Sequence, residues 1–165
     1  MSEKQYNVLV LCTGNSARSV LGEVLFNSLG KGMFKAYSAG SKPAGKVNPG
    51  AIEWLQAHGH SIEGLRSKSW DEFSRPDAPE FDFIFTVCDN AAGEACPIWL
   101  GHPATAHWGI PDPAHIEGDE ARRAAFSKAA DQLARRIGLF MALPIEKLDK
   151  LALKDKLNEI GRIQD

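Results

Sequence analysis

Apolar residues recur along the chain with two spacings, and each spacing predicts one kind of element. Tyr6–Leu11 is β-prone and almost entirely apolar, which is typical of a strand covered on both faces. The next apolar residues recur at helical spacing, on one face of a helix that Gly30 ends: Val20, Val24, Leu25 and Leu29. The N-terminal region is therefore predicted to be a strand followed by a helix.

The same alternation continues along the chain. Further strands are predicted by short apolar runs: Phe34–Ala39, ended by Gly40, then Phe81–Cys88, and a weaker run near Thr105–Trp108. Further helices are predicted from Asn48-Pro49, with Ala51, Ile52 and Leu55 on one face, and over Ala121–Leu143. Alternating strands and helices predict an α/β fold with a parallel sheet. Because ligands bind at the carboxyl ends of such strands, we expect the residues directly after Leu11, Val87 and Trp108 to lie together.

Length and composition indicate one soluble domain. The chain has 165 residues, enough for a single core, and its net charge of −2 gives no electrostatic reason to bind nucleic acid or an anionic membrane. The apolar run Val8–Leu11 is far too short for a signal peptide or a membrane span. We therefore expect a cytoplasmic protein without a cofactor, whose three cysteines do not form a structural disulfide framework.

The segment after the first strand carries the strongest chemical signal, with the form Cys-x5-Arg-Ser. Five intervening residues can wrap a loop whose backbone N–H groups point inward as an anion nest, and the helix N-terminus adds further donors. Arg18 can clamp two oxygens of a tetrahedral oxyanion, while Gly14 and Asn15 tolerate the positive φ of a tight loop. The predicted oxyanion site is Thr13, Gly14, Asn15, Ser16, Ala17, Arg18 and Ser19.

Cys12 lies beside the same N–H groups, helix N-terminus and Arg18, and their positive electrostatic field favours a thiolate. Thiols at helix N-termini beside a cation have their pKa lowered from about 8.5 to roughly 3.5–7.5. Ser19 is placed to donate a hydrogen bond to that thiolate, which would then be a nucleophile aimed at the bound anion. The structural alternative is a buried cysteine before an N-capping turn.

The segment Cys12-Thr-Gly-Asn-Ser-Ala-Arg-Ser19 resembles the phosphate-binding loop of the low-molecular-weight protein tyrosine phosphatase superfamily, to which thiol-linked arsenate reductases belong. The resemblance covers the chain from about Asn7 to Leu143. It implies a four-stranded parallel sheet in the order 2-1-3-4, flanked by helices, with residues 1–143 as the phosphatase-like domain and residues 144–165 as its helical extension.

The reductase and phosphatase branches differ in their second chemical step. A phosphatase hydrolyses its cysteinyl adduct with water, whereas a reductase needs further thiols, because two thiolates supply the two electrons. Cys88 ends the third predicted strand, next to the first, and Cys96 follows seven residues later before Pro97. This stretch resembles the redox segment of the reductases, which implies that Cys88 and Cys96 are resolving thiols. The alternative is that Cys88 belongs to the core and Cys96 has no role.

Asp112 stands in a Pro-Asp-Pro loop, where the superfamily has its general acid. Two flanking prolines hold it rigidly, which suits a positioned proton donor. The phosphotyrosine phosphatases usually have aromatic residues after Asp-Pro, but here Ala114 and His115 follow, which resembles the reductases. The alternative for Asp112 is a turn-forming residue.

Two features depart from the family pattern. Many members have a second cysteine in the loop before the arginine, but here Ala17 occupies that position, so only Cys88 and Cys96 remain as resolving thiols. Some reductases also bind potassium beside the loop, through residues that match Asn15, Glu23 and Ser38. Arg66 and Lys68 stand where the remaining ligands would fall, and a basic side chain can replace the charge of the metal, so we expect no bound cation.

These residues predict an arsenate reductase. Cys12 attacks arsenic, Asp112 protonates the departing oxygen, and Cys88 and Cys96 pass the disulfide to thioredoxin or to glutathione with glutaredoxin. Phosphate or sulfate is expected to occupy the same loop. The alternatives are a low-molecular-weight phosphatase acting through a Cys12 phosphoenzyme and a non-catalytic oxyanion-binding or redox-sensing module.

The tail after Pro144 reads as an amphipathic helix that ends near Gly161. Its apolar positions recur at helical spacing: Ile145, Leu148, Leu151, Ala152, Leu157 and Ile160. A short amphipathic helix needs a surface for this stripe, either the domain itself or a second copy in a homodimer, so the protein is expected to be a monomer or a weak homodimer. We expect the tail to contribute stability and to have no part in the chemistry.

Overall fold

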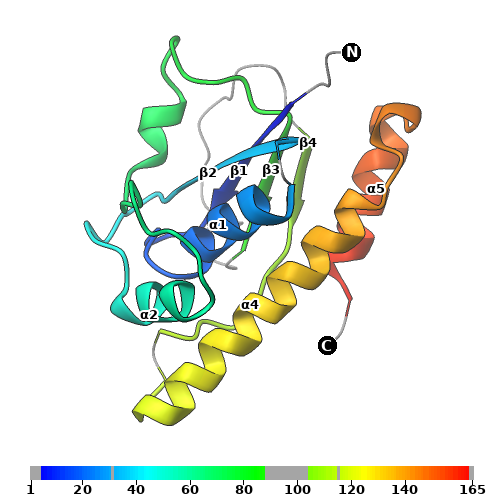
Figure 1. Ribbon diagram of the computed structural model, residues 1–165. Helices are drawn as coiled ribbons and strands as arrows, with labels where there is room; N and C mark the ends of the chain where they lie inside the picture. Colours follow the sequence, from blue (N-terminus) through cyan, green and yellow to red (C-terminus); the bar gives the residue numbers. More distant parts are fainter. Residues whose placement is uncertain (1–4, 31, 88–103, 115, 164–165) are drawn as a thin grey trace.

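The computed structural model describes residues 5–30, 32–87, 104–114 and 116–163. Four parallel strands form one sheet in the order β2-β1-β3-β4, which confirms the predicted fold (Figure 1). The strands are β1 (Tyr6–Leu11), β2 (Phe34–Ala39), β3 (Phe83–Thr86) and β4 (Ala104–His107). The helices are α1 (Arg18–Gly30), α2 (Pro49–Ala57), α4 (Asp119–Met141) and α5 (Lys150–Gly161), with short 3-10 helices η1 (Trp70–Phe73) and η2 (Ile145–Lys147).

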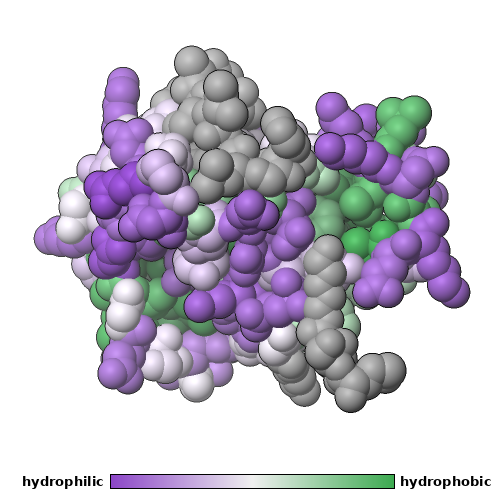
Figure 2. Space-filling model, turned by 90° about the horizontal axis from the view of Figure 1, so that it is seen from above, coloured by the Kyte–Doolittle hydropathy of each residue, from purple (hydrophilic) through white to green (hydrophobic). Residues whose placement is uncertain are grey.

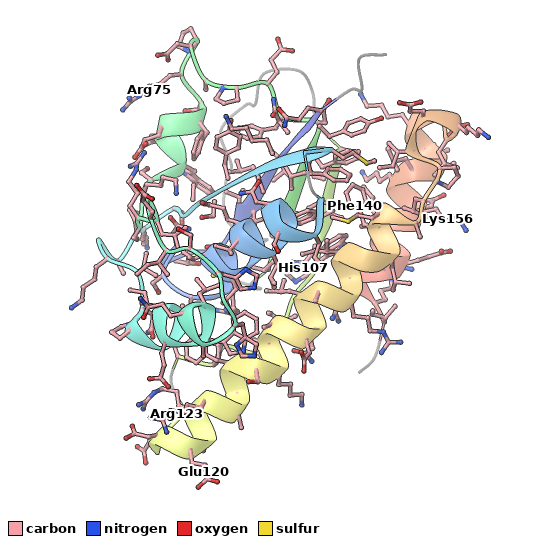
Figure 3. The ribbon with its side chains drawn as sticks, in the orientation of Figure 1. Arg75, His107, Glu120, Arg123, Phe140 and Lys156 are labelled. Carbon is pink, nitrogen blue, oxygen red and sulfur yellow. The ribbon has the colours of Figure 1, made fainter. Side chains whose placement is uncertain are left out.

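Alternate residues of β1 enter different halves of the core. Val8 and Val10 face a large aromatic cluster under α1 and α4, to which Phe140 of α4 contributes its ring (Figure 3). Leu9 and Leu11 face the smaller cluster that η1 covers. Both faces of the strand are buried, as its continuous apolar run predicts.

The strand β3 and the helix α1 differ in detail from the prediction. β3 (Phe83–Thr86) begins at Phe83 rather than at Phe81, and Phe81 packs against Phe73 of η1, with ring centroids 5.6 Å apart. Cys88 lies outside the described residues. The buried face of α1 is rotated from the predicted stripe, and Leu29 is 43% exposed. The rotation brings the backbone of Gly22 onto β1, where a Cβ atom would lie 2.9 Å from Val10 Cγ1.

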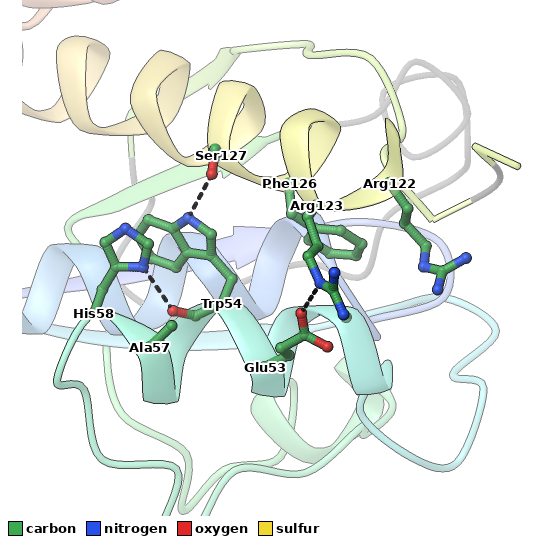
Figure 4. Close-up of a pocket in the computed structure, with 9 residues that line it drawn as sticks. Glu53, Trp54, Ala57, His58, Arg122, Arg123, Phe126 and Ser127 are labelled. Carbon is green, nitrogen blue, oxygen red and sulfur yellow. Dashed lines mark hydrogen bonds and ion pairs between the residues drawn. The ribbon is translucent and has the colours of Figure 1, made fainter. Parts of the chain in front are cut away.

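The helix α2 begins as predicted and is pinned to α4. Asn48 caps it by accepting a hydrogen bond of 2.8 Å from the N–H of Gly50, and Pro49 occupies the first turn. The indole Nε1 of Trp54 donates to Ser127 Oγ over 3.2 Å (Figure 4). A cavity of about 180 Å³ remains between the two helices beside this contact.

The tail contains a helix, but the helix starts later than the pattern predicted. Its first part is η2, and α5 begins at Lys150, capped by Asp149, which accepts a 2.7 Å hydrogen bond from the N–H of Ala152. The buried face is Leu153, Leu157 and Ile160. Leu151, which the predicted stripe placed inside, is 71% exposed, and apolar surface is visible on that side of the molecule (Figure 2). No helix in the described ranges is long and apolar enough to cross a membrane.

Candidate active site

The loop between β1 and α1 forms a cavity of about 310 Å³ at the carboxyl edge of the sheet. Its walls come from three segments that are distant in the sequence: Cys12, Thr13, Gly14, Asn15, Ser16, Ala17 and Arg18, then Asn48, then Asp112 and Ala114. The expectation that the residues after the first and fourth strands meet is therefore confirmed. Cys88 and Cys96 lie outside the described residues.

Hydrogen bonds on its outer side fix the orientation of the loop backbone. The carbonyl of Thr13 accepts from the N–H of Lys42 at 3.0 Å, and that of Gly14 accepts from the N–H of Ala44 at 2.9 Å. The carbonyl of Ser16 is held in the same way, by the N–H of Asn48 at 2.8 Å. In a trans peptide the next N–H points opposite to the carbonyl, so these bonds turn N–H groups toward the cavity. The resulting nest suits an oxyanion.

Asn15 holds the loop from within. It adopts the predicted left-handed conformation, with φ of 45°, whereas Gly14 does not have a positive φ. Its buried amide donates to Ser19 Oγ at 2.8 Å and accepts from the N–H of Lys68 at 2.8 Å. Because Ser19 accepts this bond, its own hydroxyl proton remains available to a thiolate. An asparagine tolerates this conformation better than residues with bulkier side chains.

Gly40 allows the loop to approach the end of β2. A Cβ atom there would lie 2.3 Å from the carbonyl oxygen of Thr13 and 2.6 Å from that of Cys12. Both are backbone atoms and cannot rotate away. We expect Gly40→Ala to lower the free energy of unfolding by about 1–3 kcal/mol and to weaken phosphate binding, since the start of the nest must move.

The matched control is Gly138→Ala in α4, where a Cβ atom meets nothing within 4 Å. This substitution should raise stability by roughly 0.5–1 kcal/mol and leave phosphate binding unchanged. Urea unfolding and calorimetric titration with phosphate measure both quantities. Wild-type phosphate affinity in Gly40→Ala would show that the close approach does not shape the nest.

Arg18 and Asp112 form an ion pair in the lining of the cavity. The Nη2 atom of Arg18 lies 3.5 Å from Asp112 Oδ2, and its Nη1 atom donates to the carbonyl of Ile110 at 3.0 Å. The other carboxylate oxygen of Asp112 accepts from the N–H of Ala114 at 2.9 Å. Cys12 is buried at 6% exposure in the same cavity. A nucleophile, an anion clamp and a carboxyl group thus share one small space.

A buried lysine, Lys68, lies behind the loop. The sequence offered Arg66 and Lys68 as the basic side chains that could replace the charge of a metal there. The ammonium of Lys68 is 3.6 Å from Glu23 Oε1, and Ser38 Oγ donates to the same oxygen at 2.7 Å. Burial lowers the pKa of Lys68, and the nearby carboxylate of Glu23 opposes that shift. Arg66 instead pairs with Glu72 at the surface, at 2.6 Å.

We expect Lys68→Met to destabilise the protein by up to about 3 kcal/mol near neutral pH, because it leaves the carboxylate of Glu23 without its cation. The double variant Lys68→Met/Glu23→Gln should recover most of this loss, since no buried charge remains. Urea unfolding of the single and double variants measures the difference. Equal destabilisation in both would mean that the pair carries no such coupling.

Comparisons with known proteins show the family to which the chain belongs. The sequence profile described as low molecular weight phosphotyrosine protein phosphatase matches residues 7–153. The chain belongs to this family. Relatives within it include the arsenate reductase of Halalkalibacterium halodurans, 34% identical over 134 residues that cover 81% of this chain and 93% of the relative. The arsenate reductase of Bacillus subtilis is 33% identical over the same shares.

Solved structures of this family have the same fold as this chain. An arsenate reductase from Archaeoglobus fulgidus superimposes with a TM-score of 0.60 at 30% identity, over 79% of this chain and 98% of that chain. A low molecular weight protein tyrosine phosphatase from T. tengcongensis gives 0.64 at 22% identity, over 87% and 100%, and this likeness concerns the fold alone. The site residues that sequence reasoning missed are the outer supports of the family's loop: Gly40, Lys42, Ala44 and Asn48. The sequence marked Asn48 as a helix start, and the glycines and proline after β2 are typical of a turn.

Proposed function

We propose that the protein reduces arsenate to arsenite, with Cys12 as the nucleophile. The observation that carries this proposal is a small cavity that holds Cys12, Arg18 and Asp112 and has no aromatic residue among the described residues that line it. An aryl phosphate needs a surface for its ring, whereas an inorganic oxyanion needs only the nest. The named arsenate reductases among the relatives support the same reaction.

The first step forms a bond between sulfur and arsenic. Arg18 and the inward N–H groups bind arsenate, and the thiolate of Cys12 attacks the arsenic atom. An oxygen of arsenate leaves as water, taking a proton from Asp112, whose carboxyl lies 3.5 Å from Arg18. Arsenic remains in its +5 state in this adduct.

The second step transfers the electrons. The thiolate of Cys88 attacks the sulfur of Cys12, and as the S–S bond forms the S–As bond breaks, leaving its electron pair on arsenic, which departs as arsenite. Cys96 then attacks Cys88 and frees Cys12. Support comes from strand register: Leu11 pairs with Thr86, and the N–H of Val87 donates to the carbonyl of Leu11 at 2.9 Å. Val87, the last described residue before Cys88 in the sequence, is therefore bonded to the residue that precedes Cys12.

An external thiol system closes the cycle. Thioredoxin suits a disulfide between Cys88 and Cys96, whereas glutathione with glutaredoxin needs only one accessible thiol. Either would act in the cytoplasm, where thiols are kept reduced.

The test is arsenite production by the purified protein, with thioredoxin and its reductase or with glutathione and glutaredoxin, in separate reactions. Sustained arsenite formation with either system supports the proposal. Release of p-nitrophenol from its phosphate ester, without arsenite from arsenate, would assign the chain to the phosphatases. Oxyanion binding without turnover of either compound would make it a binding or sensing module.

The relay makes a separate prediction. Cys96→Ser should yield about one arsenite per enzyme and trap a disulfide between Cys12 and Cys88, because no third thiolate is left to attack Cys88. Cys88→Ser should release no arsenite through the relay and retain the Cys12 adduct. Mass spectrometry after a single turnover distinguishes these species. Normal turnover of Cys88→Ser with glutathione would mean that an external thiol resolves the adduct.

A further inference from the structure

The C-terminal helix α5 packs directly on β4, the strand that leads into the Asp112 loop (Figure 1). Trp108 follows β4 and is fully buried, with its ring centroid 3.8 Å from that of Phe85. Its indole Nε1 donates a 3.0 Å hydrogen bond to the carbonyl of Leu157 in α5. A buried indole N–H requires such a partner, and here the tail supplies it.

The end of α5 touches the end of β4 without an intervening side chain. A Cβ atom on Gly161 would lie 2.2 Å from the carbonyl oxygen of His107 and 3.0 Å from Trp108 Cδ1. Beyond the helix, the carbonyl of Ile163 accepts a 3.2 Å hydrogen bond from Nη2 of the buried Arg136 in α4. The end of the tail is thus fastened to α4 as well as to the strand.

Trp108 is four residues from Asp112, and hydrogen bonds to the end of β3 hold the backbone between them at two positions. The N–H of Trp108 donates to the carbonyl of Thr86 at 2.7 Å, and the N–H of Ile110 donates to that of Val87 at 3.2 Å. The carbonyl of Ile110 accepts from Arg18, whose other Nη atom faces Asp112. The chain from Trp108 to Asp112 is thus a short covalent link between α5 and the carboxyl, whereas Arg18 is held separately in α1.

We propose that α5 is a positioning element for the general acid, with Trp108 and Gly161 as the positioning residues that set the place of Asp112. The assignment of Asp112 as the acid rests on the proposed function. The inference replaces the expectation that the tail has no part in the chemistry. A misplacement of about 1 Å in a catalytic group can cost on the order of a hundredfold in rate. Contacts of α5 with Trp108, four residues from the acid, are therefore expected to affect turnover.

The test uses Trp108→Phe, which removes the indole N–H, and Gly161→Ala, which forces the helix end away from His107. Each should slow single-turnover arsenite formation by about tenfold while changing the phosphate dissociation constant by less than about twofold. In an Asp112→Asn background the same substitutions should cause little further loss, because the acid that they misplace is already absent. Unfolding of the variants is measured beside these rates.

Phe73→Leu is the control for general destabilisation, since Phe73 packs in the core on the opposite face of the sheet. It should lower stability without changing the single-turnover rate at a temperature where it is folded. If Trp108→Phe and Gly161→Ala slow the reaction as much in the Asp112→Asn background as in the wild type, α5 does not act through the acid and the inference is wrong.

Hydrogen exchange decides the inference independently of the reaction. In the loop that carries Asp112, the N–H of Ile110 donates to the carbonyl of Val87 and the N–H of Ala114 donates to Asp112 Oδ1. Gly161→Ala should raise their exchange rates by about tenfold, and Phe73→Leu should leave them unchanged. Unchanged exchange in a folded Gly161→Ala protein overturns the inference even if arsenite forms. If exchange is faster in Gly161→Ala but the wild-type protein makes no arsenite, then α5 does position the Asp112 loop and only the proposed function is rejected.

Discussion

Cys12→Ser is expected to lower arsenite formation by about 10⁶-fold, the size of loss seen when an enzyme nucleophile is removed. A serine hydroxyl stays protonated near neutral pH, whereas the nest and Arg18 favour a thiolate at Cys12. Single-turnover arsenite yield at saturating arsenate measures the effect. No cysteinyl adduct should be detected by mass spectrometry.

Phosphate binding provides the control for Cys12→Ser. The nest is built from backbone N–H groups whose carbonyls are held by Lys42, Ala44 and Asn48, and none of these bonds involves the side chain of Cys12. The variant should therefore bind phosphate within about threefold of the wild type. Full arsenate reduction by the serine variant would reject the mechanism, because another atom would have to attack arsenic.

Arg18→Lys is expected to lower the rate by about 10²–10³-fold, the usual cost of losing a preorganised donor for a developing oxyanion. A lysine keeps the charge, but its single ammonium cannot offer the two parallel N–H groups of a guanidinium. It also cannot bond the carbonyl of Ile110 while facing Asp112, as Arg18 does. Initial rates over a range of arsenate concentrations separate the loss in binding from the loss in turnover.

Arg122→Lys is the matched control, because Arg122 is a surface residue that pairs with Asp119 in the first turn of α4. It should leave the rate unchanged. Wild-type kinetics in Arg18→Lys would mean that the loop amides alone hold the anion.

The sequence alone predicted the features that depend on local spacing. The continuous apolar run of Tyr6–Leu11 indicated a strand buried on both faces, and Asn48-Pro49 indicated a helix start that an asparagine caps. The Cys-x5-Arg spacing predicted a nest in which Gly14 and Asn15 could take a positive φ, and Asn15 alone of the two does so. The strand order came from the family resemblance, since periodicity does not say which strands pair.

The tertiary structure decided which distant residues support the local ones. Leu29 and Leu151 are at helical spacing with buried neighbours, yet both are exposed, because packing of Gly22 on β1 and of Gly161 on β4 fixes how each helix is rotated. Gly40 shows no signal beyond a strand end until the carbonyls of Cys12 and Thr13 are found against it. The sequence placed Trp108 only at the end of the fourth predicted strand, and the folded chain brings the carbonyl of Leu157 to its indole. Periodicity reports which residues avoid water, but contacts between segments far apart in sequence depend on shape and on hydrogen bonds that no local pattern encodes.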